Sequence, residues 1–227
     1  IESFKPEEFW TLSVKFVDEK NQNITASISQ LDNNKIEKFS FRTKDEINKA
    51  ISNINKKKFT ITDISSKVVN RNPSGPFTTS TLQQTASSRL GFGASRTMQI
   101  AQKLYQGIEI EGETIGLITY MRTDGTNLSK DAVLDFRNYI KKEIGNEYLP
   151  ENALNYSGRK AKNAQEAHEA IRPTDIVRTP QSVKKYLSPD QNKLYDLIWS
   201  RALSSQMESA KFDRNTITII SDNNDTV

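Results

Sequence analysis

The sequence of 227 residues has no cysteine and only one histidine. The lack of cysteine excludes disulfides, thiolate catalysis, cysteine zinc sites and iron–sulfur clusters within these residues. With one histidine, a zinc site made of protein side chains alone is not expected. No apolar run reaches the roughly 18 residues that a membrane-spanning helix requires, so we expect no membrane partner.

Neither sign of charge dominates the chain. Lysine and arginine number 32 against 28 aspartates and glutamates, which gives a formal net charge of +4, and 26% of the residues are charged. This composition is typical of a globular protein of one or two domains. So small a positive excess is only a weak indication of nucleic-acid binding, which has to be argued from particular sites.

Alternating apolar and polar residues predict strands in the first third of the chain and again near its end. The predicted strands are residues 10–17, 23–31, 36–42, 59–69 and 214–220. Turns rich in Asp and Asn separate the first of them, which indicates one antiparallel sheet. A capping box from Thr43 to Glu46, followed by apolar residues at helical spacing, predicts a short helix in the same region.

The composition changes at residues 72–76 (NPSGP), which is turn chemistry typical of a domain boundary. Beyond it, helices are predicted at 79–90, 95–106, 130–144, 165–171 and 189–207, with N-caps at Ser80, Ser95, Ser129 and Ser188 and with Gly91 ending the first. We therefore expect a multi-domain α+β fold, in which an all-α domain is inserted in an antiparallel β domain. The expected boundaries are 1–74 for the β-rich part, 75–209 for the helical domain and 210–227 for a return strand.

One segment, residues 116–129 (GLITYMRTDGTNLS), combines side chains suited to chemistry on a phosphate. Tyr120 offers a phenol, which has an ordinary pKa of about 10 and needs a nearby cation, base or metal to attack at neutral pH. Arg122 can hold phosphate oxygens with two hydrogen bonds. In an extended segment Tyr120, Arg122 and Asp124 point to the same side. By spacing alone, the pattern also fits a half-buried strand tyrosine beside an exposed arginine.

Three further stretches accompany this segment in a fixed order: residues 76–84 (PFTTSTLQQ), residues 89–98 (RLGFGASRTM) and residues 164–174 (AQEAHEAIRPT). Together the four stretches resemble the active-site region of the bacterial type IA DNA topoisomerases. Residues 6–10 (PEEFW) are similar to the start of the arch domain in that family. The resemblance implies that residues 1–74 and 210–227 belong to the arch domain, and that residues 75–209 carry the active-site tyrosine.

The resemblance implies a reaction as well as a fold. Tyr120 is implied to attack a phosphodiester in a single DNA strand, forming a 5′-phosphotyrosine link and releasing a 3′-hydroxyl. Another strand passes through the gap and the link is reversed, which relaxes negatively supercoiled DNA without ATP. Arg122 and His168 are implied as further catalytic residues. Thr97, Arg122, Asp124 and His168 are implied to contact DNA.

The residues around His168 also allow a plainer interpretation. His168 shares one face of the predicted helix 165–171 with Ile171, and a histidine in such a place is typically a packing residue. Glu166 and Glu169, which flank it, are interpreted as a solvated helix face rather than as an acid–base pair.

Type IA enzymes also have a toprim domain ahead of this region, which binds magnesium through acidic residues and supplies a glutamate beside the tyrosine. No Asp-x-Asp cluster precedes Tyr120 here, and Glu111 and Glu113 lie in a segment interpreted as a turn or hairpin. The sequence also begins at Ile1 rather than at methionine. We therefore expect a central part of a longer enzyme, with no metal of its own and no activity alone. The resemblance implies Mg²⁺ in the whole enzyme, single-stranded DNA as partner, a monomer, and a cytoplasmic, nucleoid-associated location.

A second hypothesis is a non-catalytic module of the same fold that binds single-stranded DNA or another protein. Tyrosine recombinases also form phosphotyrosine links, but they need several separated arginines and a tyrosine near the end of a helical domain. The order of residues in this sequence does not fit that pattern.

Overall fold

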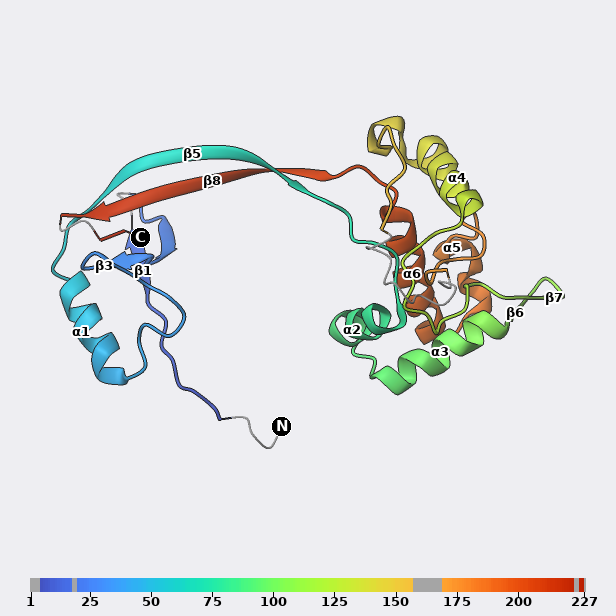
Figure 1. The fold of residues 1–227 in the computed structure, drawn as a ribbon, viewed down its shortest axis with the longest axis horizontal. Helices are drawn as coiled ribbons and strands as arrows, with labels where there is room; N and C mark the ends of the chain where they lie inside the picture. The colour runs from blue at the N-terminus through green and yellow to red at the C-terminus, as the bar shows by residue number, and fades with distance from the viewer. Residues whose placement is uncertain (1–4, 18–19, 157–168, 223–224, 227) are drawn as a thin grey trace, which may run out of the picture. The chain divides into compact units, whose positions relative to one another are not determined.

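The structure, a computed structural model, describes residues 5–17, 20–156, 169–222 and 225–226. The chain divides into two compact units (Figure 1): the first comprises Ile1–Val69 and Phe212–Val227, and the second comprises Asn70–Lys211. Along the chain, the second unit therefore lies between the two parts of the first. Both connections run through the strands β5 (Phe59–Arg71) and β8 (Ala210–Ser221), which pair as a two-stranded sheet. The fold is α+β, with a helical unit inserted in a strand-containing one.

Two short hairpins begin the first unit. The strand β1 (Ser13–Val17) pairs antiparallel with β2 (Asn23–Ser27). The strand β3 (Gln30–Leu31) pairs antiparallel with β4 (Asn34–Lys35) across a turn at Asp32 and Asn33, whose φ angles are 48° and 64°. Asp and Asn tolerate this left-handed conformation better than most residues, which is why they can form so tight a turn.

The predicted single sheet is wrong for the described residues. The pairs β1–β2, β3–β4 and β5–β8 are separate two-stranded sheets. The predicted strand at 36–42 is a loop, because the turn at Asp32 directs the chain back onto β3 and the pairing ends at Lys35. Ile36 and Phe41, whose alternation suggested a strand, reach the hydrophobic core from this loop instead.

Helix α1 (Lys44–Ile54) closes the core of the first unit. Its predicted capping box is confirmed: the Glu46 N–H donates to Thr43 Oγ1 at 3.3 Å, and the Thr43 N–H donates to the Glu46 carboxylate at 3.0 Å. Each large aliphatic side chain buried here stabilises the fold by about 1.5–3 kcal/mol relative to exposure. The buried core residues are Ile28, Leu31, Phe41, Ile47, Ala50, Ile54 and Ile219.

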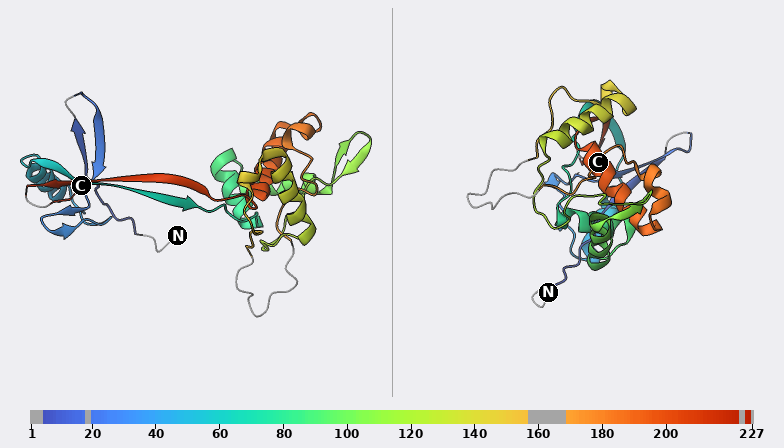
Figure 2. Two further views of the ribbon diagram at one scale, coloured as in Figure 1. Left: turned by 90° about the horizontal axis from the view of Figure 1, so that it is seen from above. Right: turned by 90° about the vertical axis from the view of Figure 1, so that its right-hand side faces the viewer.

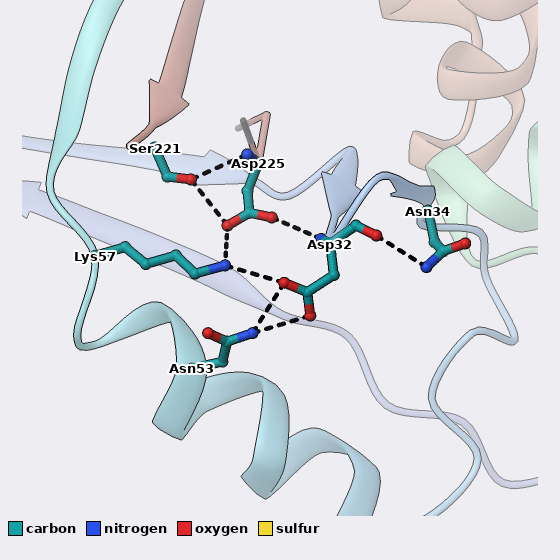
Figure 3. Close-up of polar contacts among 6 residues, drawn as sticks. All are labelled: Asp32, Asn34, Asn53, Lys57, Ser221 and Asp225. Carbon is teal, nitrogen blue, oxygen red and sulfur yellow. Dashed lines mark hydrogen bonds and ion pairs between the residues drawn. The ribbon is translucent and has the colours of Figure 1, made fainter. Parts of the chain in front are cut away.

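A buried ion-pair network joins the β3–β4 turn to the residues that flank β5 and β8 (Figure 3). Lys57 Nζ contacts the Asp225 carboxylate and lies 3.2 Å from Asp32, while the Lys57 and Asp225 side chains are only 4% and 1% exposed. Asp225 also accepts hydrogen bonds from the Asp32 N–H at 2.6 Å and from the Ser221 hydroxyl at 2.9 Å. Asn53, on α1, donates to Asp32 at 2.9 Å. Lys57 therefore joins the β3–β4 turn to the segment that follows β8, and Asp32 extends the network to α1.

The pKa values of this pair follow from two opposing causes. Burial by itself lowers the pKa of Lys57 and raises the pKa of Asp225, because it disfavours both charged forms. The hydrogen bonds and opposite charges outweigh burial, so the pKa of Lys57 lies above its ordinary value and the pKa of Asp225 lies below. Each of the two groups therefore stabilises the charged form of the other, and Asp32 also favours the charged form of Lys57.

Helices dominate the second unit. They are α2 (Thr79–Leu90), α3 (Ala94–Gln106), α4 (Lys130–Tyr139), α5 (Pro180–Val183) and α6 (Pro189–Ser204). Helix α4 continues into a π-helical turn at Ile140–Ile144, and 3₁₀ turns lie at Asn146–Tyr148 and Lys184–Tyr186. The unit is not purely helical, because β6 (Ile108–Ile110) and β7 (Glu113–Ile115) form an antiparallel hairpin that projects from the helices (Figure 2).

The helix ends of this unit agree only partly with the prediction. Three predicted ends are confirmed: the N-caps Ser129 and Ser188 and the left-handed C-cap Gly91. The N-cap of α2 is Thr78 rather than Ser80, because the extended backbone at Phe77 still pairs with another segment and the helix can start only after it. Helix α3 begins after Gly93 without a side-chain cap, so the predicted cap at Ser95 is also wrong.

The predicted helix at 165–171 is wrong for Glu169–Ile171, and the rest of it lies outside the described residues. Ile171 forms an antiparallel bridge with Phe77. The backbone N–H groups of Ala170 and Ile171 donate to the carbonyls of Asn127 and Phe77, so they are not available for helical hydrogen bonds.

The core of the second unit lies between its helices and the extended segment that follows β7. The helix α6 contributes Leu194, Tyr195 and Ile198, which have no exposed surface. Burial raises the pKa of the Tyr195 phenol, whose hydroxyl donates to the Arg178 carbonyl at 2.7 Å. The other fully or nearly fully buried large side chains of this core include Phe77, Leu82, Leu104, Leu117, Ile118, Met121 and Ile171.

Candidate active site

The segment of residues 117–125 alternates between the core and the solvent. The side chains of Ile118, Met121 and Thr123 are buried, with exposed fractions of 1%, 1% and 7%. The side chain of Tyr120 is 40% exposed. Arg122 and Asp124 are also exposed. Tyr120, Arg122 and Asp124 therefore share the outward parity that the sequence predicted.

Hydrogen bonds from the start of α2 hold this segment on one side. The Thr79 N–H donates to the Thr123 carbonyl at 2.8 Å, and the Thr79 hydroxyl donates to the Met121 carbonyl at 2.9 Å. In return, the Thr123 N–H donates to the Thr79 hydroxyl at 2.8 Å. The backbone on both sides of Arg122 is thus tied to the motif at 76–84.

Residues 170–174 form a second set of hydrogen bonds with this segment, at Leu117 and Thr119. The Thr119 N–H donates to the Arg172 carbonyl at 2.9 Å, and the Thr119 hydroxyl donates to the Ala170 carbonyl at 2.7 Å. The Thr174 N–H donates to the Leu117 carbonyl at 3.0 Å. The tyrosine is therefore presented by a backbone that is paired immediately before and immediately after it, which limits the positions its side chain can take.

The half-exposed carboxylate of Glu169 stabilises this second contact. Arg172 makes two hydrogen bonds to Glu169, both 2.9 Å, and the Ser129 N–H donates to Glu169 at 2.6 Å. Burial alone raises the pKa of Glu169, but these hydrogen bonds and the arginine charge outweigh it and hold that pKa below its ordinary value. Glu169 is therefore an ion-paired, half-exposed residue outside any helix, rather than part of a solvated helix face. Sequence reasoning did not identify Arg172 as a residue that supports the site, because the sequence pattern does not indicate which carboxylate it pairs with.

Helix α3 supplies the nearest aromatic neighbour of Tyr120 in the described residues. The rings of Tyr105 and Tyr120 meet edge to face, with centroids 5.4 Å apart and planes at 65°. Such an arrangement is worth about 0.5–1.5 kcal/mol beyond area burial and restrains the phenol ring. The Leu117 N–H also donates to the Leu104 carbonyl at 2.8 Å, which attaches the segment to the end of α3. Sequence reasoning missed Tyr105, because no motif pairs it with Tyr120.

Gly116 is needed where the segment passes α3. A Cβ atom at this position would lie 2.7 Å from the Tyr105 carbonyl oxygen. We expect Gly116→Ala to destabilise the second unit by about 1–3 kcal/mol, since backbone atoms must shift to relieve the overlap. Denaturant unfolding followed by Trp199 fluorescence in a Trp10→Phe background measures this loss.

Gly93→Ala is the matched control for that change. Nothing lies within 4 Å of a Cβ at Gly93, and its φ of −62° suits any residue. We expect its effect to stay within about 0.5 kcal/mol. Equal effects of the two substitutions would show that the contact with Tyr105 does not constrain the segment.

The other predicted site residues lie differently. Thr97 has no exposed surface, and its hydroxyl donates to the Gly93 carbonyl at 3.1 Å. The structure therefore gives no support to a contact between Thr97 and DNA. His168 lies outside the described residues, so its place beside Tyr120 stays a prediction.

Metal-ligating side chains do not gather in the parts of the chain that the structure describes: no group of three His, Asp or Glu residues there can hold an ion. Glu111, at the tip of the β6–β7 hairpin, accepts a hydrogen bond from the Tyr186 hydroxyl at 2.8 Å. The described residues thus do not fit a magnesium site. No described helix is long and apolar enough to cross a membrane.

Comparisons with known proteins agree with one another. A model of the DNA topoisomerase family matches residues 1–227. The DNA topoisomerase 1 of Rickettsia typhi (strain ATCC VR-144 / Wilmington) is 48% identical over 223 residues, which are 98% of this chain and 28% of that protein. That of Xylella fastidiosa (strain 9a5c) is 43% identical over 227 residues, again 98% of this chain and 28% of the relative.

A solved structure gives the same result for the fold. The full-length topoisomerase I of Thermotoga maritima is similar with a TM-score of 0.71 and 36% sequence identity. The likeness covers 96% of this chain and 32% of that one. This chain therefore spans less than a third of the length of these relatives.

Proposed function

This chain belongs to the DNA topoisomerase family, and from that premise we propose that it is the tyrosine-bearing part of a type IA enzyme that cleaves and reseals one DNA strand. One observation carries the proposal. Tyr120 and Arg122 stand exposed on the same side of a backbone that is hydrogen-bonded to two other segments, so a phenol and a guanidinium are presented together on a rigid support.

The proposed step exchanges one phosphodiester for another. The Tyr120 oxygen attacks the phosphorus, a bond forms between them, and the bond from phosphorus to the 3′-oxygen breaks. The phenol proton is lost to a base or to water, and the departing 3′-oxygen takes up a proton to become a hydroxyl. Reversal restores the DNA, so the cycle needs no ATP.

Arg122 is proposed to hold the scissile phosphate. Its guanidinium can donate two hydrogen bonds to phosphate oxygens, and it stabilises the negative charge that grows on them as the bond forms. Asp124 faces the same side and is proposed to orient a cation or a base near the phosphate. His168 is proposed to assist Tyr120 or to contact DNA.

The remaining assignments follow from the family resemblance and are part of the same proposal. Residues 1–74 and 210–227 are assigned to the arch domain, and residues 75–209 to the tyrosine domain. The whole enzyme is proposed to act as a monomer on single-stranded DNA in the cytoplasm, associated with the nucleoid. It is proposed to use Mg²⁺ bound outside this chain, in a toprim domain.

A chimera tests the proposed function. Residues 1–227 replace the matching 223-residue segment of the Rickettsia typhi relative, to which they are 48% identical. We expect the purified chimera to relax negatively supercoiled plasmid and to form a covalent adduct with the 5′-phosphate end of the broken strand. We expect residues 1–227 alone to relax no plasmid, because the other groups that stabilise the developing charges are proposed to lie in the toprim domain.

The chimera also decides between the two hypotheses. A chimera that folds and binds single-stranded DNA but forms no adduct would contradict the enzyme and favour a binding module. Relaxation by residues 1–227 alone would contradict the division of catalytic groups between this chain and another domain.

A further inference from the structure

An open groove of about 880 Å³ runs along helix α3 to the segment that carries Tyr120. Its polar lining comes mainly from exposed or half-exposed side chains of α3: Arg96, Gln99, Gln102, Lys103 and Gln106. Arg122 lines the groove from the tyrosine segment, and Asp190 lines it from the first turn of α6. The groove and the candidate active site therefore share Arg122.

The charges of the lining favour an anion. Three cationic side chains, Arg96, Lys103 and Arg122, face one carboxylate, that of Asp190. That carboxylate is paired with Arg96, whose guanidinium also lies 4.8 Å from the centre of the Phe92 ring. Arg96 is thus partly neutralised, whereas no described carboxylate forms an ion pair with Lys103. The positive charge of the lining that is not paired with a carboxylate therefore comes from Lys103 and Arg122.

We propose that this groove binds the stretch of single-stranded DNA that adjoins the scissile phosphate. The inference rests on the proposed function, because the strand is the one that Tyr120 cleaves. Lys103 holds a phosphate next to the one held by Arg122, and the amides of Gln99 and Gln102 hydrogen-bond phosphate oxygens or base edges.

The chemistry of the lining matches this ligand better than a compact anion. Lysine, arginine and glutamine side chains are common donors to phosphates in nucleic-acid complexes. Glutamine amides both donate and accept, so they can also meet the Watson–Crick edges that only an unpaired strand exposes. A single phosphate would use the cations and leave the three glutamines of the groove without a role.

The ion pair between Arg96 and Asp190 sets the affinity of the groove. A DNA phosphate that reaches Arg96 has to compete with the Asp190 carboxylate, which also repels the strand. Removing that carboxylate releases a cation and removes a negative charge, whereas removing the Lys103 charge does the opposite. The two substitutions are therefore expected to change DNA affinity in opposite directions.

The test measures binding of a labelled short oligothymidylate to residues 1–227 across a series of salt concentrations. We expect Lys103→Gln to weaken binding about fivefold at about 0.1 M salt, because each lost phosphate contact reduces the slope of log affinity against log salt by ~0.7 for single strands. We expect Asp190→Asn to tighten binding and to steepen the slope by up to about 0.7. General loss of structure would weaken binding in both variants.

Lys141→Gln is the matched control, because Lys141 is an exposed lysine of the same unit that lies outside the groove lining. It removes the same charge and is expected to leave the slope unchanged. Equal effects of the Lys103 and Lys141 changes, or no measurable binding by the unaltered chain, would overturn the proposal. Binding that does not change in any of the three variants would also overturn it.

Different results would contradict the DNA-binding role of the groove and the proposed enzymatic function. If the chimera forms the covalent adduct but Lys103→Gln does not change DNA binding, the proposed enzymatic function stands and the proposed role of the groove is contradicted. If DNA binding changes as expected in the variants but the chimera forms no adduct, the proposed role of the groove stands and the proposed enzymatic function is contradicted.

Discussion

Tyr120→Phe is expected to abolish covalent adduct formation and plasmid relaxation by the chimera. The substitution removes only the hydroxyl, so the phenyl ring can keep its edge-to-face contact with Tyr105, and the backbone hydrogen bonds around it are unaffected. Without the oxygen no bond to phosphorus can form. Removing a covalent nucleophile costs on the order of 10⁶ in rate in the serine protease subtilisin, and we expect a loss of comparable size here.

The measurement is denaturing electrophoresis of the chimera with an end-labelled single strand, alongside a plasmid relaxation assay. Tyr148→Phe is the matched control, since Tyr148 is 46% exposed against 40% for Tyr120 and lies in a separate 3₁₀ turn. The control is expected to retain adduct formation, and both variants are expected to bind single-stranded DNA as the unaltered chimera does. Cleavage that survives in Tyr120→Phe would show that another group is the nucleophile.

Asp225→Asn is expected to destabilise the first unit by about 3–5 kcal/mol. The substitution leaves the Lys57 ammonium, which is 4% exposed, without its nearest opposite charge, and breaking a buried pair by removing one partner typically costs that much. It also replaces an acceptor of hydrogen bonds from the Asp32 N–H and the Ser221 hydroxyl. Lys57→Met is expected to be destabilising as well, because the buried Asp225 carboxylate then lacks its cation.

The chain allows each unit to be measured separately, because it has two tryptophans. Trp10 packs against the core of the first unit and Trp199 against that of the second. In a Trp199→Phe background, denaturant unfolding followed by Trp10 fluorescence reports the first unit alone. Glu37→Gln, which removes an exposed ion pair with Lys35 in the same unit, is the control and is expected to cost less than about 1 kcal/mol. A similarly small change in Asp225→Asn would show that the buried network contributes little.

The pH dependence of the Asp225→Asn effect has a definite sign. The pKa of Asp225 is lowered in the folded protein, so its contribution to stability is present above the unfolded pKa of about 4 and is lost as pH falls through the folded pKa. The pKa of Lys57 is raised, so its contribution is present below the unfolded pKa of about 10.4 and is lost as pH rises through the folded pKa. The difference between the unaltered chain and the variant is therefore largest between these limits.

The sequence by itself determined the local features of the site. The outward parity of Tyr120, Arg122 and Asp124 follows from the two-residue period of an extended chain, and burial of Met121 and Thr123 confirms it. The caps at Thr43, Ser129 and Ser188 were also predictable, because a cap needs only a side-chain acceptor and an N–H three residues later. The family followed from four motifs in order and needed no coordinates.

Only the tertiary structure decided which segments hold these residues in place. Thr79 and Arg172 bond the tyrosine segment across 44 and 53 residues of chain, and no local pattern indicates such partners. Distant pairing of Ile171 with Phe77 also made Glu169–Ile171 extended rather than helical, and packing of α3 buried Thr97. Propensity and periodicity describe a segment and its immediate neighbours, whereas burial and backbone pairing depend on everything that packs against it.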